Sequence, residues 1–223
     1  MERKRAAFIA IGQSPRPDIV EEMRPWWGAQ AEAVEVEEHG VLDGLSREEI
    51  DGLAPEDGDV RLVSRLRDGT EVLLGAHWVH DRVQDLVASL GERKLDLIVL
   101  LCTGRFPGLQ SKTLLVKAGP VVDHGLAAFA ATTSTIGVLV PHETQKESFR
   151  CDAAPSRRFL LSHASPYSGN RWEDAANEIE GADIIVMHCM GYDERMRRRM
   201  AELTGKPCLL ARRLVAAATA QVI

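Results

Sequence analysis

Residues 95–104 read LDLIVLLCTG, and residues 184–191 read IIVMHCMG. Each stretch is an apolar run of strand length that leads to a cysteine, with a glycine two residues further on. Continuous apolar runs of this kind predict strands buried on both faces, as in the parallel sheets of α/β proteins. Because ligands collect at the carboxyl ends of such strands, Cys102 and Cys189 mark two comparable candidate positions for a functional site.

The residues before the first run alternate between strand and helix patterns. Residues 6–11 predict a short strand, and a polar loop leads from it to a helix over residues 19–26. Residues 33–38 alternate like a half-exposed strand, and Ser46 with Glu49 forms a capping-box pattern at the start of another short helix. An Asp-Gly pair between two alternating runs predicts an antiparallel hairpin within residues 60–74. Apolar residues at helical spacing follow over 78–90.

The second part of the chain repeats this plan. It contains a strand at 136–140, a loop, helix and strand up to 162, a helix at 172–179, the second cysteine run, a basic helix and a final Ala-rich helix. We therefore predict an α/β protein of two pseudo-symmetric parallel-sheet halves, with the hairpin as a small insertion in the first. The halves would be residues 1–133, carrying Cys102, and residues 134–223, carrying Cys189. The final helix would be free to pack back on the first half.

Composition limits the classes of partner. The 223 residues are 45% hydrophobic and 27% charged, which is typical of a globular protein. The formal net charge of −6 argues against binding to nucleic acid or to an anionic membrane, so we expect a small-molecule partner. The N-terminal apolar run, residues 6–11, is too short for a signal-peptide core or a membrane span. A cytoplasmic location is the expectation that follows.

The two motif cysteines suggest acid–base chemistry. A thiol between a strand end and a helix N-terminus can have its pKa lowered from about 8.5 by the helix amides. Two such thiols on opposite sides of a bound carbon acid could work in turn, the thiolate removing a proton and the neutral thiol delivering one. The alternative is that each cysteine is packed as a small hydrophobic residue. We interpret Cys151 and Cys208, which lack the motif, in this second way.

Four segments carry a family resemblance. They are IGQSPRPD at 11–18, LSREE at 45–49, IGVLVP at 136–141 and CMGY at 189–192, and together they look like the AroM family. AroM proteins resemble the aspartate/glutamate (hydantoin) racemase superfamily. This resemblance implies a racemase-like fold and a cofactor-independent two-cysteine mechanism, with Cys102 and Cys189 at the matching positions.

The residues beside the cysteines depart from the racemase pattern. Racemases of the superfamily commonly continue with Asn-Thr after the first cysteine and with Thr after the second. Here Thr103 and Gly104 follow Cys102, and Met190 and Gly191 follow Cys189. We assign these four neighbours to substrate binding, although Thr103 could equally bond its hydroxyl to the backbone.

The loops after the first strand of each half supply further candidates. In the first loop, Ser14 and Arg16 could hold a carboxylate together with helix N-terminal amides, and we take Arg16 as the anion anchor. The same residues could equally form a helix cap without any ligand. Thr144 occupies the corresponding loop of the second half, where a cap is again the alternative.

Other polar residues favour structural interpretations. Neighbouring strand residues point to opposite faces, so His188 is expected to be a packed or surface histidine and not a partner of Cys189. His142 in the second loop is a better candidate for a general acid. The arginines at 195 and 197–199 fit a solvated helix face. No zinc-ligand spacing and no nucleotide-binding motif is present, so we predict no metal and no cofactor.

The sequence therefore favours a cofactor-independent racemase or epimerase acting on a small carboxylate or cyclic amide, with Cys102 and Cys189 as paired acid and base. A decarboxylase or cis-trans isomerase using one nucleophilic cysteine is the alternative within the same scaffold. A sensor or binding protein without turnover is the alternative outside enzymes. The superfamily resemblance also makes a homodimer reasonable.

Overall fold

The computed structural model describes residues 3–169 and 171–223. The first half is built on a sheet of four parallel strands in the order β2-β1-β5-β6. These strands span Lys4–Ala10 (β1), Val34–Gly40 (β2), Leu97–Leu100 (β5) and Leu115–Lys117 (β6). All four residues of β5 are buried, as the continuous apolar run predicts. The three-residue strand β6 was not predicted, because it is too short to show a period.

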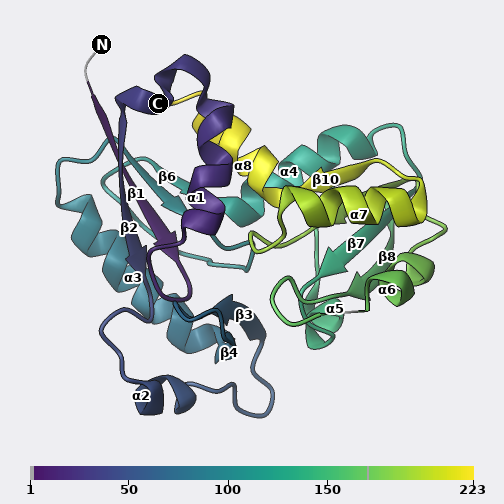
Figure 1. The fold of residues 1–223 in the computed structure, drawn as a ribbon, viewed down its shortest axis with the longest axis horizontal. Coiled ribbons are helices and arrows are strands. Elements are labelled where there is room, and N and C mark those ends of the chain that lie inside the picture. Colours follow the sequence, from purple (N-terminus) through teal and green to yellow (C-terminus); the bar gives the residue numbers. More distant parts are fainter. Residues whose placement is uncertain (1–2, 170) are drawn as a thin grey trace.

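The second half contains an equivalent sheet, also wholly parallel, in the order β8-β7-β9-β10. Its strands span Thr135–Val140 (β7), Arg158–His163 (β8), Ile184–Met187 (β9) and Cys208–Leu210 (β10). The two sheets have the same topology when the hairpin strands are left out of the count. In each half, the strand that comes second in the sequence lies at one edge, followed across the sheet by the first, the third and the fourth. This shared order confirms the predicted pair of pseudo-symmetric α/β halves, which lie side by side in Figure 1.

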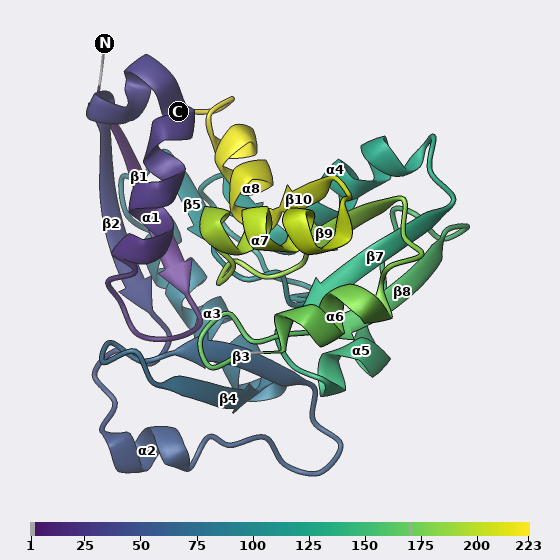
Figure 2. The same cartoon turned by 45° about the vertical axis from the view of Figure 1, so that its right-hand side comes forward.

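The predicted hairpin is present as an antiparallel pair, β3 (Arg61–Arg65) and β4 (Glu71–Gly75). Gly69 in its turn has a φ of 95°, a conformation that strongly favours glycine. Figure 2 shows the hairpin as a separate layer across the end of the first half, on the side that faces α5 and α6 of the second. Two contacts tie it to that half: Gln145 Nε2 donates to the carbonyl of Arg61 at 2.8 Å, and Ser165 Oγ bonds to Glu71.

Helices connect the strands at positions close to those predicted. Those of the first half are α1 (Pro17–Met23), a 3-10 segment η1 (Arg24–Ala33), α2 (Arg47–Asp51), α3 (Ala76–Gly91) and α4 (Ala118–Ala130). Those of the second are α5 (Thr144–Ser148), α6 (Trp172–Glu178), α7 (Glu194–Thr204) and α8 (Ala211–Thr219). The capping box at the start of α2 is confirmed in both directions. None of the helices in the described ranges is long and apolar enough to cross a membrane.

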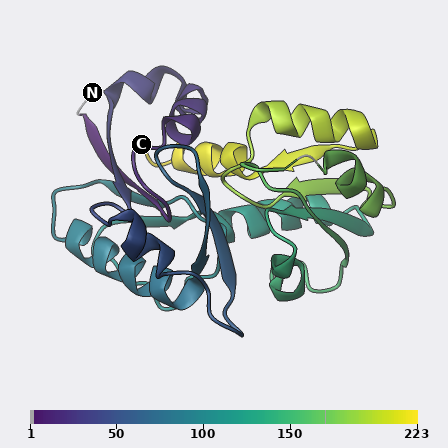
Figure 3. The same cartoon turned by 60° about the horizontal axis from the view of Figure 1, so that its bottom comes forward.

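The last helix joins the two halves. α8 packs against α1, η1 and α4, and Figure 3 shows it between the two sheets. Trp27 Nε1 of the first half donates to Thr219 Oγ1 of α8 at 3.1 Å. One cluster of buried side chains runs through this region and includes Phe8 and Val99 of one sheet and Ile136 and Val186 of the other. The halves therefore share a core, which fixes the strand ends of one relative to those of the other.

Candidate active site

The topology places the motif residues at neighbouring strand ends. In each half the strand order reverses between the first and third strands, which is where open α/β sheets bind ligands. The loop with Arg16 follows β1, and Cys102 follows its neighbour β5. In the second half Pro141 follows β7, and Cys189 follows its neighbour β9.

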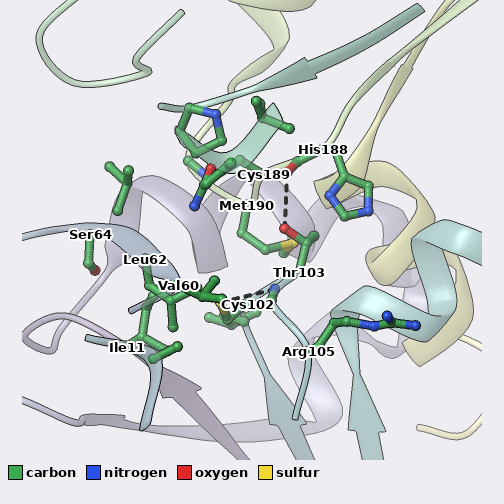
Figure 4. A pocket seen from close by; sticks show the side chains of 18 of the residues that line it. Ile11, Val60, Leu62, Ser64, Cys102, Thr103, Arg105, His188, Cys189 and Met190 are labelled. Atoms are coloured by element: carbon green, nitrogen blue, oxygen red, sulfur yellow. Dashed lines mark hydrogen bonds between the residues drawn. The ribbon is translucent and has the colours of Figure 1, made fainter. Parts of the chain in front are cut away.

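These strand ends meet at one cavity of about 200 Å³. Both Cys102 and Cys189 line it, together with Arg16, Thr103, Gly104, Met190 and Gly191 (Figure 4). The wall contributed by the first half includes four residues of the hairpin region, Val60, Leu62, Val63 and Ser64. The second half contributes Val140, Pro141, Phe149 and Tyr167. The cavity is thus mainly apolar, with a few polar groups that could orient a ligand.

The two Cys-x-Gly segments make the same local contact. The backbone N–H of Gly104 donates to Cys102 Sγ at 3.4 Å, and the N–H of Gly191 donates to Cys189 Sγ at 3.3 Å. Glycine is needed at position 191, since a Cβ there would lie 2.6 Å from the hydroxyl of Tyr167 and 2.7 Å from Pro166 Cγ. The motif therefore gives each sulfur one amide donor in matching positions of the two halves.

The expected lowering of the thiol pKa values is wrong in direction. Burial raises the pKa of Cys102 to about 12, against the opposing effect of the Gly104 amide. Burial also raises the pKa of Cys189, although the Gly191 amide and the positive charges of Arg16 and Arg212 oppose that rise. No helix begins directly after either cysteine to supply the expected amides, as α7 starts only at Glu194. Both thiols are consequently neutral in the free protein at neutral pH.

Arg16 is a buried residue of the cavity wall. Its Nε and Nη2 each donate to the carboxylate of Asp18 at 2.8 Å, and Nη2 also donates to the Tyr167 hydroxyl at 3.2 Å. Within the described residues its Nη1 has no hydrogen-bond partner, which leaves that end of the guanidinium for a ligand. The pairing with Asp18 fixes the orientation of the Arg16 guanidinium.

Two residues near Cys189 were not found from the sequence. Tyr167 of the β8–α6 loop lines the cavity and contacts Arg16, 151 residues away. Arg212 at the start of α8 is 3% exposed and donates through Nε to the carbonyl of Met190 at 2.6 Å and through Nη2 to that of Gly191 at 3.0 Å. No local motif marks either residue, although Arg212 within an apolar helix start is a signal for a buried ion pair.

Thr103 joins the two cysteine loops. Its hydroxyl donates to the backbone carbonyl of His188 at 3.0 Å, across the boundary between the halves (Figure 4). His188 itself lines the cavity, and its Nε2 lies 3.1 Å from Asp123 Oδ1. His188 is thus a packed histidine, with its ring edge-on against Phe149, and it makes no hydrogen bond to Cys189 in the described chain, as expected. Its place on the cavity wall was not predicted, because β9 ends at Met187 and the alternation of strand side chains stops there.

The remaining candidates lie outside the cavity lining in the described chain. The hydroxyl of Ser14 donates to Asp43 at 2.5 Å, which makes it a loop-fixing residue. Thr144 Oγ1 and His142 Nδ1 bond to each other at 2.9 Å. Cys151 and Cys208 are buried elsewhere.

The basic residues after Cys189 belong to a surface network. Arg197 and Arg198 pair with Glu194 on the same helix, and Arg199 pairs with Glu173. Arg198 and Arg199 fit the solvated helix face that the sequence favoured, whereas the side chain of Arg197 is only 19% exposed. In the described ranges no group of three or more His, Cys, Asp or Glu side chains is arranged to hold a metal ion.

Comparisons with known proteins agree with this architecture. The chain matches the family described as AroM protein over residues 6–223. No curated protein matches it in sequence. Among solved structures, arylmalonate decarboxylase superimposes with a TM-score of 0.59 at 10% identity, covering 97% of this chain and 91% of its own. Maleate isomerase Iso from Pseudomonas putida S16 superimposes with a TM-score of 0.59 at 10% identity, covering 99% of this chain and 92% of its own.

Aspartate racemase from Picrophilus torridus has a TM-score of 0.58 at 12% identity, covering 98% of this chain and 92% of its own. Identities this low establish the fold alone. The family match, by contrast, spans nearly the whole sequence. The protein therefore belongs to the AroM family, and it shares its two-half α/β fold with aspartate racemase.

Proposed function

We propose that this protein is a cofactor-independent racemase or epimerase in which Cys189 and Cys102 act as paired base and acid. The observation that carries the proposal is the matched pair of Cys-x-Gly segments, each with an amide-to-sulfur contact, on the wall of one cavity. Two thiols in comparable settings are what proton exchange between two faces of one carbon requires. Two packed cysteines would not need the same polar contact.

The charges near the two thiols indicate which cysteine acts as the base and which as the acid. The positive charges of Arg16 and Arg212 act on Cys189, so its thiolate forms more readily than that of Cys102. Because both thiols are neutral in the free protein, Cys189 first loses its proton to water. The Cys189 thiolate then removes the α-proton, and the electron pair of the C–H bond moves into the adjacent carboxylate, which Arg16 binds. Cys102 then gives its proton to the opposite face of the carbon. The cycle leaves a Cys102 thiolate and a Cys189 thiol, which return to the starting state by proton exchange with water.

A single-cysteine reaction is the second candidate. The difference between the two thiols favours it, because a Cys102 with a pKa of about 12 is a poor base for the reverse direction. Arylmalonate decarboxylase and maleate isomerase share the fold, so the scaffold is compatible with decarboxylation and cis-trans isomerisation as well as racemisation. In that case Cys189 alone would act as the nucleophile or acid.

Hydrogen exchange in deuterated water distinguishes these reactions. Small chiral carboxylates are incubated with the protein, and loss of the α-hydrogen signal is followed by NMR together with optical rotation. A two-base enzyme should exchange and racemise its substrate. Cys102→Ser and Cys189→Ser should each lower racemisation by about 10² or more, because serine is a far weaker acid than a thiol.

Cys208→Ser is the matched control, since Cys208 is buried outside the cavity and should leave turnover unchanged. Loss of activity in Cys189→Ser with full activity in Cys102→Ser would replace the two-base mechanism by the single-cysteine one. Racemisation by the double serine variant would exclude both. A chain that binds carboxylates without any exchange would be a sensor or binding protein.

A further inference from the structure

The charged side chains of the cavity are mostly positive. Arg16, Arg105 and Arg150 line it, whereas Asp123 is the one carboxylate among the described lining residues. Asp123 already faces His188, whose Nε2 lies 3.1 Å from its Oδ1. A ligand anion can therefore be met by Arg16 Nη1, whereas the one carboxylate on the described walls, Asp123, is already engaged with His188.

The rest of the wall is apolar, and the hairpin supplies its most distinctive part. Leu62 projects from β3 onto the Cys102 loop, where a Cβ on Gly104 would lie 3.0 Å from Leu62 Cδ2. Val60 and Ile11 lie close to Leu62 in Figure 4. This part of the wall is on one side of the two cysteines, and His188 with Arg105 is on the other. A group attached to the reacting carbon can thus rest on the hairpin.

The cost of burying each kind of ligand group in this cavity distinguishes between ligand classes. An α-amino acid carries an ammonium group on the reacting carbon, and burying that charge without a carboxylate partner is costly. A neutral cyclic amide has no anion for Arg16. An apolar substituent, by contrast, gains free energy in proportion to the area it buries against the wall.

We infer that the ligand is a carboxylate whose α-carbon carries apolar substituents and no ammonium group, with Leu62 of the hairpin as a specificity-determining residue. This inference rests on the proposed function in placing the reacting carbon between Cys102 and Cys189. The carboxylate would bind Arg16 Nη1, and the apolar substituent would contact Leu62. The hairpin insertion would thereby set which substituent the site accepts.

Three ligands that share the same side chain test the inference. They are 2,3-dimethylbutanoate, valine and 5-isopropylhydantoin, which place a methyl group, an ammonium group or a cyclic amide next to the same isopropyl group. Binding is measured by calorimetry with the Cys102→Ser, Cys189→Ser double variant, so that turnover plays no part. The carboxylate without nitrogen should bind at least about tenfold more tightly than either of the others.

Leu62→Ala should weaken binding of 2,3-dimethylbutanoate by about tenfold through lost apolar contact. Leu73→Ala is the matched control on the same hairpin, because Leu73 does not line the cavity and should leave the affinity unchanged. Tighter binding of valine or the hydantoin, equal effects of the two leucine variants, or no binding of the carboxylate at millimolar concentration would each overturn the inference. Preferential binding of the carboxylate without hydrogen exchange by the wild-type protein would support the ligand class while refuting the isomerase.

Discussion

Arg212 connects the loop of Cys189 to the first half of the molecule. Besides the carbonyls of Met190 and Gly191, its Nη1 bonds to the carbonyl of Asp18 at 2.5 Å and to the carboxylate of Glu22. One buried guanidinium therefore ties together α8, the Cys-x-Gly loop and α1. Replacing Arg212 by Met would keep most of the apolar stem and remove all of these bonds.

The cost of that replacement follows from the partners left behind. Breaking a buried ion pair typically costs ~3–5 kcal/mol, because the remaining charge is buried alone. Here the side chains of Glu22 and Asp18 are 29% and 30% exposed, so water can partly solvate them. The loss should fall at the low end of that range, at about 3 kcal/mol.

Urea unfolding measures this difference directly. Arg213→Met is the matched control: Arg213 is the next residue on the same helix, is 38% exposed, and pairs with Glu194. A surface pair of this kind is worth less than about 1 kcal/mol. Equal midpoints of unfolding for the two variants would refute the view that Arg212 holds the site together.

Alkylation of Cys189 gives a second readout that stability alone would not change. The positive charge of Arg212 lowers the pKa of Cys189 against the effect of burial, so its removal should raise that pKa further. The thiolate fraction at a given pH then falls, and the pH profile of alkylation should move to higher pH in Arg212→Met. An unchanged profile would mean that the guanidinium acts on packing alone.

Three further predictions concern the cysteines and their loop. Iodoacetamide labelling followed by peptide mapping should modify Cys189 before Cys102, since Cys189 is the more exposed of the two and has the favourable charges nearby; the opposite order would contradict the assigned base. Turnover of an identified substrate should rise with pH and still be rising at about pH 9, because burial raises the pKa of both thiols and only a thiolate removes a proton; a flat profile would point to another base. Gly191→Ala should cost about 1–3 kcal/mol in thermal unfolding by forcing Tyr167 away, whereas Gly181→Ala, whose Cβ would make an ordinary 3.5 Å contact, should cost much less.

The sequence identified the features that depend on neighbouring residues. The two apolar runs became the buried strands β5 and β9, and the Asp-Gly pair became the turn of the hairpin. The repeated order of strand and helix indicated two similar halves. These features follow from local rules of burial and backbone conformation, which a linear pattern records directly.

The electrostatic character of the site depended on residues far apart in the chain. A strand end before a helix suggested acidic thiols, but the hairpin, α1 and the β8–α6 loop close around them and make burial the larger effect. Arg16 was identified from its own loop, whereas its contact with Tyr167 and the cavity-facing position of His188 were not.

Arg212 is the clearest example of a contact that the sequence does not reveal, because it lies 194 residues from its partner Asp18 and 22 residues from its partner Met190. The sequence thus determined which residues stand at the strand ends. Only the tertiary structure decided their protonation and their partners, because desolvation and Coulomb interactions depend on distances in space and on the walls that exclude water.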